Sequence, residues 1–394
     1  MSPAPACPAC GGSTLEPVWQ VPSVPVHSCL MVESEAEARA FPRGRLDLVF
    51  CPACGFLFNA AFDPALQHYS PAYEETQAFS PRFLRFLAEL CEDQASKYAL
   101  AGKLALEIGC GKGEFLAALV ERTGCRGIGI DPGFRPERLT THAAARLTFV
   151  RDLYGPAWSR LAPDYLACRH TLEHIGPVAA FVRDIRRTLG ARSDTVVMFE
   201  LPDLRRILVE QAFWDLYYEH ASYFTAGSLA RLFRREGFSV HALWRCYDDQ
   251  YLVLEARPAA GPTAPALPLE DDLAETRALV AAFRTGIGGK LAELRDRIEG
   301  GRREGKRIAI WGSGSKAVAF LVVLGLGEEI AAVVDVNPHK HGRWLAGTGH
   351  RILGPDDLVR VRPDVVLVMN PIYVDEIRRD LGVRGLAPLL VPMR

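Results

Sequence analysis

The run FWDLYYEHASYF, residues 213–224, places four groups that can handle protons in successive positions: Tyr217, Tyr218, Glu219 and His220. Such a cluster could do acid–base chemistry. The alternative is ordinary packing, because aromatic-rich runs are commonly buried and an isolated Glu–His pair commonly lies on the surface. The other patterns in the chain have to decide between the two interpretations.

Four cysteines form two units of the same design, Cys7-Pro-Ala-Cys10-Gly and Cys51-Pro-Ala-Cys54-Gly. Each Cys-x-x-Cys spacing lets two thiolates reach one ion, and the glycine permits the tight turn. Four thiolates in tetrahedral geometry suit Zn²⁺ in a closed, structural site. The alternatives are two unrelated pairs or a redox dithiol.

The other six cysteines are scattered singly in apolar segments, which in a cytosolic chain favours buried free thiols over a disulfide framework. We do not expect Cys29 to be a metal ligand. The paired cysteines lie in a Pro-rich segment, residues 1–68, that is too short to bury a sufficient core alone. We therefore expect bound metal to stabilise this module.

A first glycine-rich turn, Glu107-Ile-Gly109-Cys-Gly111-Lys-Gly113, lies between a predicted strand and a predicted helix. Glycines let the backbone approach a ligand closely, and the start of the helix offers free N–H groups. Asp131 ends the next predicted strand, where a carboxylate can take both hydroxyls of a ribose. Glu107 ends the first strand, where it can reach the amino-acid end of a cofactor. The alternative is a glycine turn that binds no nucleotide.

A second glycine-rich turn, Trp311-Gly312-Ser-Gly314-Ser-Lys316, again joins a predicted strand to a predicted helix. It suggests a cradle for a phosphate or a nucleotide, with Lys316 adding positive charge near the start of the helix. Asp335 ends the following strand, as a ribose-binding carboxylate would. A vestigial nucleotide fold and a pyridine dinucleotide site are the rival hypotheses. The absence of a third glycine at the usual place argues against the second of them.

The order of these patterns predicts an α/β protein of several parts. Strand and helix patterns alternate from the first glycine turn to about residue 257, and again from residue 305 onward. Between them we expect a linker by composition at 258–268 and a charged amphipathic helix that the glycine pair 288–289 interrupts. The predicted division is a zinc module at 1–68, a nucleotide-binding core at 69–258, a linker and helix at 259–304, and a second nucleotide fold at 305–394.

The totals exclude some classes of partner. The 394 residues carry 46 basic and 47 acidic side chains, so the formal net charge of −1 gives no footprint for nucleic acid or an anionic membrane. The sequence shows neither a signal-peptide pattern nor an apolar run long enough to span a bilayer. We expect a cytoplasmic protein with a small-molecule substrate. Our default is a monomer, because packed domains already bury one another.

The spacing Glu-x-Gly-x-Gly-x-Gly resembles motif I of the class I S-adenosylmethionine-dependent methyltransferases. The segment CRHTLEHI, residues 168–175, resembles the strand-4 region of the same enzymes. The resemblance implies a Rossmann-like core that binds S-adenosylmethionine, with Asp152 in VRDLY where such enzymes often contact adenine. His170 and His174 then line or support the site rather than catalyse.

The whole chain resembles the three-domain, zinc-containing sugar C-methyltransferases of deoxysugar and antibiotic biosynthesis. The likeness rests on the domain order, the G-x-G-x-K turn, DVNPHKHG at 335–342, ILGPDDL at 352–358, and an asparagine before DEI. It implies that a nucleotide-linked keto-deoxysugar is held between the central and C-terminal domains. The residues implied to bind it in the C-terminal domain are Gly312, Gly314, Lys316, Asp335, Lys340 and Asn370.

The family's Tyr-x-Glu-His signature matches Tyr217 to His220. By this resemblance His220 is the base that removes a proton from a carbon next to a ketone, which suits a side chain with a pKa near neutrality. Glu219 and Tyr217 would polarise or orient the substrate's oxygens. We expect Tyr218, which falls at the variable position, and Tyr223 to lie at the acceptor, and Glu200 of MFELPD to line the pocket.

The family also supplies a tyrosine from the segment after the zinc module, here HYSPAYEETQAFSP. Tyr73 is the first candidate and Tyr69 the second. Related sugar enzymes carry an aromatic and serine-rich run at this place, whereas this chain has Glu75, Thr76 and Gln77. The departure leaves open a non-sugar acceptor methylated at carbon, oxygen or nitrogen. A non-enzymatic nucleotide-binding scaffold is a third hypothesis.

Overall fold

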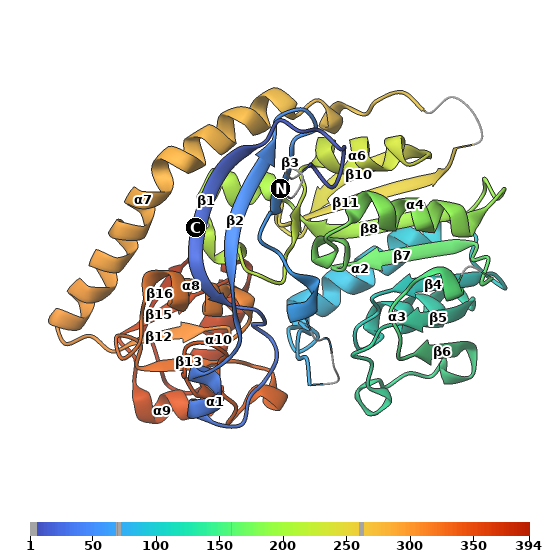
Figure 1. Ribbon diagram of the computed structural model, residues 1–394. Coiled ribbons are helices and arrows are strands. Elements are labelled where there is room, and N and C mark those ends of the chain that lie inside the picture. Colours follow the sequence, from blue (N-terminus) through green and yellow to red (C-terminus); the bar gives the residue numbers. More distant parts are fainter. Residues whose placement is uncertain (1–5, 68, 70–71, 159, 260–263) are drawn as a thin grey trace.

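Three β-sheets, formed by successive parts of the chain, organise the computed structural model (Figure 1). The structure describes residues 6–67, 69, 72–158, 160–259 and 264–394. Parts of the predicted linker (260–263) and of the segment before Tyr73 (68, 70 and 71) lie outside these ranges, as do residues 1–5. In the described ranges, no helix has both the length and the apolar character needed to cross a membrane.

The strands are grouped here by sheet. The N-terminal sheet contains β1 (Glu16–Pro25), β2 (Arg43–Cys51), β3 (Phe56–Asn59) and β9 (Ser222–Tyr223). The central sheet contains β4 (Leu104–Ile108), β5 (Arg126–Ile130), β6 (Leu147–Val150), β7 (Tyr165–Arg169), β8 (Val196–Pro202), β10 (Phe238–Cys246) and β11 (Tyr251–Pro258). The C-terminal sheet contains β12 (Ile308–Trp311), β13 (Ala332–Val334), β14 (Ile352–Leu353), β15 (Val365–Val368) and β16 (Leu389–Pro392).

The α-helices of the described chain follow the same division. The first is α1 (Glu35–Arg39), between β1 and β2. The helices around the central sheet are α2 (Pro81–Lys97), α3 (Glu114–Thr123), α4 (Val178–Leu189), α5 (Leu204–Glu210) and α6 (Ala226–Arg235). The later ones are α7 (Leu273–Arg303), α8 (Ser315–Leu324), α9 (Leu358–Val361) and α10 (Val374–Val383).

The central sheet has the strand order β10-β11-β8-β7-β4-β5-β6. Its five strands from β8 to β6 are parallel, and β11 and β10 add an antiparallel edge. Every residue of β7 is buried, as expected for a parallel strand covered on both faces. The chain leaves β4 toward β5 on one side and later returns to β7 on the other. That reversal opens a ligand-binding crevice beyond the ends of β4 and β7.

The C-terminal sheet has the same kind of reversal in strand order, with fewer strands. Its five parallel strands have the order β14-β13-β12-β15-β16, so the reversal falls between β12 and β15. The second glycine-rich turn follows β12, at that reversal. The two predicted nucleotide folds, and with them the α/β class, are therefore confirmed.

The N-terminal strands do not form a separate body. The sheet order β1-β2-β3-β9 takes its last strand from the central part of the chain, with Leu57 opposite Tyr223. Val18 of β1 and Leu48 of β2 belong to the same buried cluster as residues of α7 and α8. Figure 1 shows β1 and β2 running along α7 toward the C-terminal sheet. The zinc-module segment thus shares its core with the rest of the molecule.

The predicted interruption of the helix near residues 288–289 is wrong, because α7 runs unbroken through both glycines. A Cβ built on Gly288 or Gly289 would meet no heavy atom within 4 Å, so neither glycine is required for close packing. Glycine costs roughly 1 kcal/mol relative to alanine inside a helix, which weakens a helix without ending it. Burial of Val280, Phe283 and Ile287 against the shared core keeps this one intact.

Candidate active site

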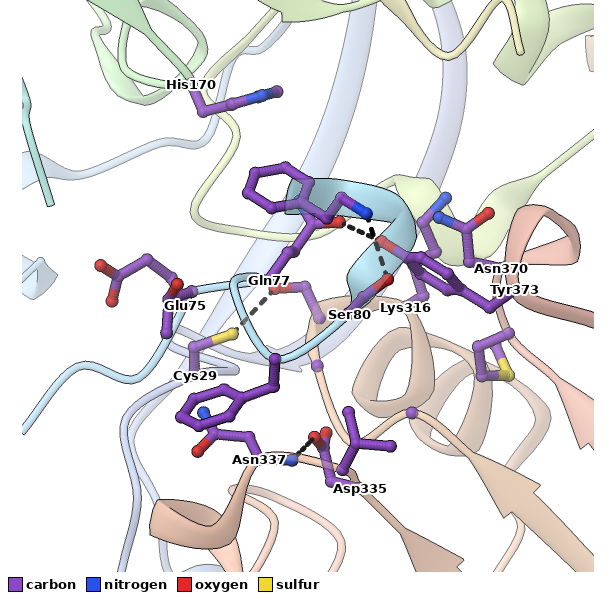
Figure 2. A pocket seen from close by; sticks show the side chains of 18 of the residues that line it. Cys29, Glu75, Gln77, Ser80, His170, Lys316, Asp335, Asn337, Asn370 and Tyr373 are labelled. Carbon is purple, nitrogen blue, oxygen red and sulfur yellow. Dashed lines mark hydrogen bonds between the residues drawn. The ribbon is translucent and has the colours of Figure 1, made fainter. Parts of the chain in front are cut away.

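A cavity of about 1000 Å³ lies between the central and C-terminal sheets. It opens beyond the strand ends where both sheets reverse, and its lining takes side chains from both parts (Figure 2). The predicted site residues in the lining are Tyr73, Glu107, Gly109, Gly111, His170, Tyr217, His220, Gly312, Gly314, Lys316, Asp335, Lys340 and Asn370. The fold therefore brings both glycine-rich turns and part of the YYEH run to one space.

The first turn needs its glycines for shape. Gly109 and Gly113 have φ values of 68° and 86°, in the left-handed region that side chains disfavour. A Cβ at Gly109 would collide with Thr171, and one at Gly113 would lie 2.8 Å from the Phe149 ring. Gly113 itself is outside the cavity lining and immediately precedes α3. The turn thereby brings backbone up to the cavity and aims the start of a helix at it.

The two acidic residues predicted beside this turn differ in their surroundings. Asp131 accepts hydrogen bonds from Gly111 N at 2.9 Å and Gly133 N at 2.6 Å, and it lies outside the lining. Glu107 lines the cavity, is 2% exposed, and its Oε2 has no hydrogen-bond partner within the described part of the chain. Burial raises the pKa of Glu107 to about 8. An unpartnered buried carboxylate oxygen fits a ligand that brings hydroxyl or N–H groups.

The second turn is organised around Asp335. Its carboxylate accepts hydrogen bonds from Ser313 N at 2.9 Å, Ser313 Oγ at 2.6 Å and Asn337 N at 2.9 Å. Burial opposes its ionisation, but Lys340 and these hydrogen bonds outweigh burial and lower its pKa. Lys316 ion-pairs with Asp215 at 2.8 Å. A positive side chain and a helix start thus face the cavity opposite the first turn (Figure 2).

His220 lies in the cavity wall, 5% exposed, and its Nδ1 has no hydrogen-bond partner among the described residues. Its ring centroid is 4.2 Å from that of Tyr217 and 4.9 Å from that of His174. Burial, followed by His174, His170 and Lys316, lowers the pKa of His220 well below its usual value. The imidazole is therefore neutral near pH 7.

Glu219 does not face the cavity, so its predicted contact with substrate oxygens is corrected. Its Oε1 lies 3.1 Å from His27 Nδ1, and its Oε2 accepts from Ser28 N at 2.9 Å and from the Ser28 hydroxyl. Although Glu219 is buried, His27 and Ser28 lower its pKa and hold it as a carboxylate. Glu219 fastens the segment around residue 28 beneath the YYEH run. It can position His220 only through the backbone they share.

Tyr218 and Tyr223 are corrected in the same way, because both lie outside the cavity lining. The Tyr218 hydroxyl accepts a hydrogen bond from Asp63 N at 2.8 Å. The Tyr223 hydroxyl donates to Tyr217 O at 3.1 Å and accepts from Tyr217 N at 3.2 Å. Both tyrosines stabilise the loop that carries Tyr217 and His220.

Glu200 and Asp152 also lie outside the lining. Glu200 is buried and bonds Arg169 Nε at 2.8 Å and His170 Nε2 at 2.9 Å, so it supports the pocket from behind. Burial works against protonation of His170, but Glu173 and Glu200 outweigh it and raise the His170 pKa to about 9. Asp152 is exposed and accepts from Leu153 N, so the structure gives no support for its predicted contact with adenine.

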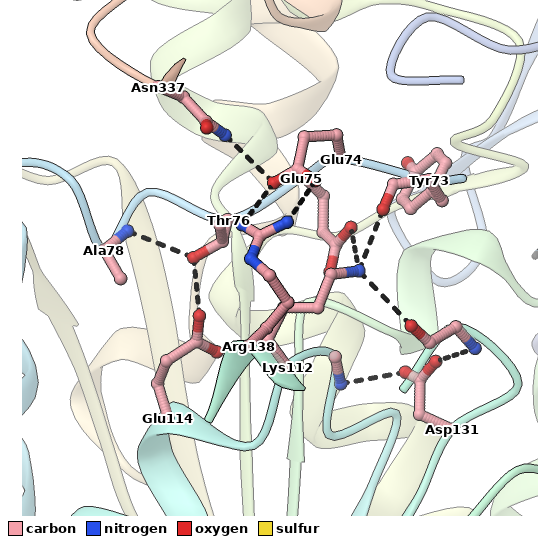
Figure 3. Close-up of polar contacts among 12 residues, drawn as sticks. Tyr73, Glu74, Glu75, Thr76, Ala78, Lys112, Glu114, Asp131, Arg138 and Asn337 are labelled. Atoms are coloured by element: carbon pink, nitrogen blue, oxygen red, sulfur yellow. Dashed lines mark hydrogen bonds and ion pairs between the residues drawn. The ribbon is translucent and has the colours of Figure 1, made fainter. Parts of the chain in front are cut away.

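Residues 73–80, called the strap here, cross the cavity between the two α/β parts (Figure 3). Lys112 of the first glycine turn is 1% exposed and bonds Tyr73 O at 2.8 Å and Glu75 Oε2 at 3.1 Å. Burial raises the pKa of Glu75 to about 7. Tyr69 lies outside the lining, and its hydroxyl is 2.8 Å from His174 Nδ1.

Three strap residues at spacings of three fasten the strap to its surroundings. Glu74 accepts from Arg138 Nη1 at 2.7 Å in the central part and from Asn337 Nδ2 at 2.9 Å in the C-terminal part. Gln77 Nε2 donates to the Tyr251 hydroxyl at 3.1 Å, and Gln77 Oε1 accepts from the Tyr373 hydroxyl at 2.8 Å. The Ser80 hydroxyl donates to Glu376 Oε2 at 2.8 Å. The sequence showed that this segment departs from that of related sugar enzymes. It could not indicate the bonding partners of the strap, because they lie far away along the chain.

The four predicted zinc ligands converge at the other end of the N-terminal sheet. All four Sγ atoms lie within 4.8 Å of one another, with Cys7–Cys54 at 3.7 Å and Cys10–Cys51 at 3.6 Å. Tetrahedral Zn–S bonds of about 2.3 Å place sulfur atoms about 3.8 Å apart, so the separations fit zinc.

Comparisons with known proteins agree with this architecture. Residues 77–243 match the family model described as a methyltransferase domain, and residues 267–384 match the one described as a C-methyltransferase C-terminal domain. C-methyltransferase NovU of Streptomyces niveus is 27% identical over 399 residues, covering 95% of this chain and 91% of NovU.

Two solved structures resemble the central part. One is the 1,6-didemethyltoxoflavin-N1-methyltransferase of Burkholderia thailandensis, with 21% identity, coverage of 45% of this chain and 78% of that one, and a TM-score of 0.35. The other is an S-adenosylmethionine-dependent methyltransferase of Mesorhizobium loti, with 16% identity, coverage of 44% and 99%, and a TM-score of 0.36.

The central fold, its glycine turn and the first family match define an S-adenosylmethionine-dependent methyltransferase. The second match and the similarity to NovU along most of both chains both point to C-methyltransferases. The chain thus contains a methyltransferase domain and is similar along its length to a C-methyltransferase.

Replacing Glu74 with glutamine should reduce the free energy of unfolding by about 2–3 kcal/mol at pH 7, because Arg138 loses a buried partner. Arg138 and Asn337 lower the Glu74 pKa from 4.5 to about 2 despite burial. The deficit of the variant should therefore be full above pH 5 and shrink as the pH falls from 4.5 toward 2. Denaturation of the wild type and the variant by urea at several pH values measures the difference in their free energies of unfolding.

The matched control is Glu35→Gln, which removes an exposed ion pair with Arg39 and should change stability by less than about 0.5 kcal/mol. A Glu74→Gln deficit that does not depend on pH would contradict the ionic bridge.

Proposed function

We propose that the protein methylates a carbon next to the carbonyl group of a nucleotide-linked keto-deoxysugar, with His220 as the base. The observation that carries this proposal is the position of His220, a histidine that burial holds neutral, in the wall of a cavity that both glycine-rich turns reach. The relative NovU is named a C-methyltransferase, which supports carbon as the methylated atom.

The donor half of the cavity suits S-adenosylmethionine. The turn containing Gly109 and Gly111 would hold it, with Glu107 meeting its polar groups and Asp131 fixing the shape of the turn. When bound, S-adenosylmethionine supplies an electrophilic methyl group on a positively charged sulfur.

The acceptor half offers groups for a nucleoside diphosphate. Gly314 precedes α8, whose first N–H groups face the cavity beside Lys316, and this combination favours a phosphate. Asp335, Lys340 and Asn370 line the same wall. A sugar attached to this nucleotide would extend from the C-terminal sheet toward His220.

His220 accepts the α-proton on a ring nitrogen, and the electron pair of the broken C–H bond moves into an enolate. The pKa of His220 lies well below its usual value because of burial, so the ring starts the reaction neutral. The enolate carbon then accepts the methyl group and the carbonyl group re-forms.

Two tyrosines in the lining can stabilise the enolate oxygen. Burial raises the pKa of both Tyr73 and Tyr217 well above 10, so both hydroxyls remain protonated and can donate hydrogen bonds. Donors placed where charge develops in the transition state accelerate a reaction more than donors to the ground state do. Tyr217 also contacts the His220 ring directly.

A second candidate keeps the donor and changes the acceptor to a non-sugar metabolite. It is favoured by the carboxylate of Glu75, which lines the cavity where related sugar enzymes have a serine-rich segment. A monomeric state and a cytoplasmic location remain predictions.

We propose that Cys7, Cys10, Cys51 and Cys54 hold a structural zinc ion. Elemental analysis of purified protein should find one zinc per chain, and Cys51→Ser should lose it and lower the melting temperature while S-adenosylhomocysteine still binds. The control Cys246→Ser removes a thiol elsewhere and should keep the zinc. A fully stable chain without zinc would contradict the site.

His220→Asn should slow exchange of the acceptor's α-proton into deuterated water by about 10²–10⁴-fold, since it removes the general base. The assay uses enzyme saturated with S-adenosylhomocysteine, thymidine- and uridine-diphosphate keto-deoxysugars, and mass spectrometry. Calorimetry should show unchanged binding of S-adenosylhomocysteine.

The matched control is His241→Asn, an exposed histidine that bonds Tyr98 outside the cavity and should leave exchange unchanged. Equal exchange by wild type and His220→Asn would rule out His220 as the base.

A further inference from the structure

A second group of metal-ligating side chains lies at the cavity wall, far along the chain from the cysteines. Glu173 and His174 sit on the turn Leu172–His174 after β7, and His220 precedes β9. One ligand atom from each of the three lies within 4.8 Å of the other two. Glu173 is 2% exposed and His220 is 5% exposed. The fold therefore assembles a carboxylate and two imidazoles in a largely dry place.

Two of these atoms lack the partners that buried polar groups normally have. Within the described residues, neither Glu173 Oε2 nor His220 Nδ1 makes a hydrogen bond. Leaving a buried donor or acceptor unpaired costs about 1–3 kcal/mol, so two such atoms in one group of neighbouring residues are unusual in a packed wall. Both belong to the group whose ligand atoms converge, and a shared ion would satisfy both.

His174 is already oriented as a metal ligand would be. Its Nδ1 is 2.8 Å from the Tyr69 hydroxyl, which can accept the Nδ1 proton and leave the Nε2 lone pair for an ion. Its ring stands at 87° to that of His220, with 4.9 Å between centroids. Tyr69 thus plays the part that an outer hydrogen-bond partner plays for metal-bound histidines.

We propose that Glu173, His174 and His220 form a second metal site, which takes an exchangeable divalent transition-metal ion. A carboxylate with two imidazoles suits ions such as Co²⁺, Ni²⁺ and Zn²⁺, whereas Mg²⁺ and Ca²⁺ prefer ligand sets made of oxygen. Three protein ligands leave open coordination positions, so this ion exchanges more readily than one enclosed by four thiolates.

Occupation of this site inhibits the enzyme, because an imidazole that coordinates the ion through Nδ1 carries its proton on Nε2 and has no lone pair left to remove the substrate proton. This consequence rests on the proposed function, whereas binding of the ion does not. Free transition-metal ions that bind at Glu173, His174 and His220 then inhibit the enzyme, while the four-thiolate site retains its zinc.

Cobalt titration of the full-length enzyme, with zinc already in the four-thiolate site, tests the proposal. We expect one further Co²⁺ per chain, with weak visible bands typical of nitrogen and oxygen ligands and no intense sulfur-to-cobalt band. Glu173→Gln and His174→Gln should each weaken this binding by about 100-fold, and Tyr69→Phe by about 10-fold. His241→Gln, outside the cavity, is the matched control and should bind cobalt like the wild type.

Absence of the extra cobalt, or unchanged affinity in both Glu173→Gln and His174→Gln, overturns the site. S-adenosylhomocysteine binding and circular dichroism identify a variant that has failed to fold. If Glu173→Gln and His174→Gln both fail to fold, the cobalt affinity of Tyr69→Phe decides whether the site exists.

In the proton-exchange assay, cobalt at saturating concentration should abolish exchange while magnesium does not. Cobalt binding without any exchange activity in metal-free buffer would contradict the proposed function alone. Full exchange activity with cobalt bound would overturn the inhibitory role.

Discussion

The burial of Phe213 and Trp214 between the N-terminal sheet, helix α5 and the C-terminal part is the constraint on which the site depends. Both side chains are at most 1% exposed and share one hydrophobic cluster with strands β1 and β2 and helices α7 and α8. The Phe213 ring stacks on Phe320 of α8 at a centroid distance of 6.0 Å. This contact fixes the C-terminal part relative to the central sheet. It also fixes the start of the loop that carries Tyr217 and His220.

The aromatic run combines buried packing with access to the cavity. Its first part packs, and its second part reaches the cavity. Tyr218, Glu219 and Tyr223 turn outward from the cavity and bond to other backbone or side-chain groups, whereas Asp215, Tyr217 and His220 lie in the lining. These contacts hold the loop that carries Tyr217 and His220, as the proposed role of His220 as a base requires, because a loosely held base loses its alignment with the reacting atom.

The sequence was most informative where function demands a local pattern. The two glycine-rich turns and the Cys-x-x-Cys units need particular residues at short spacings, so their positions could be predicted. The direction of Glu219 could not, because its partners His27 and Ser28 lie nearly 200 residues earlier. The strap bridges and the continuity of α7 likewise depend on long-range packing, which overrides local glycine propensity.

Two histidines in the cavity lining, His170 and His220, are held in opposite protonation states. His170 bonds Glu200 and stays protonated, with a pKa of about 9, whereas His220 is held neutral by burial and nearby positive charge. Two histidines that face one cavity with their pKa values pushed apart are typical of acid–base sites. Both glycine-rich turns line the same cavity, as the proposed meeting of a donor and a nucleotide-linked acceptor requires.

Calorimetric titration of thymidine diphosphate and uridine diphosphate into enzyme saturated with S-adenosylhomocysteine tests this central claim most directly. The account predicts that one nucleoside diphosphate binds per chain while S-adenosylhomocysteine remains bound. Binding of S-adenosylhomocysteine alone, with no heat from either diphosphate at millimolar concentration, would contradict the claim that the cavity holds a nucleotide-linked acceptor beside the donor.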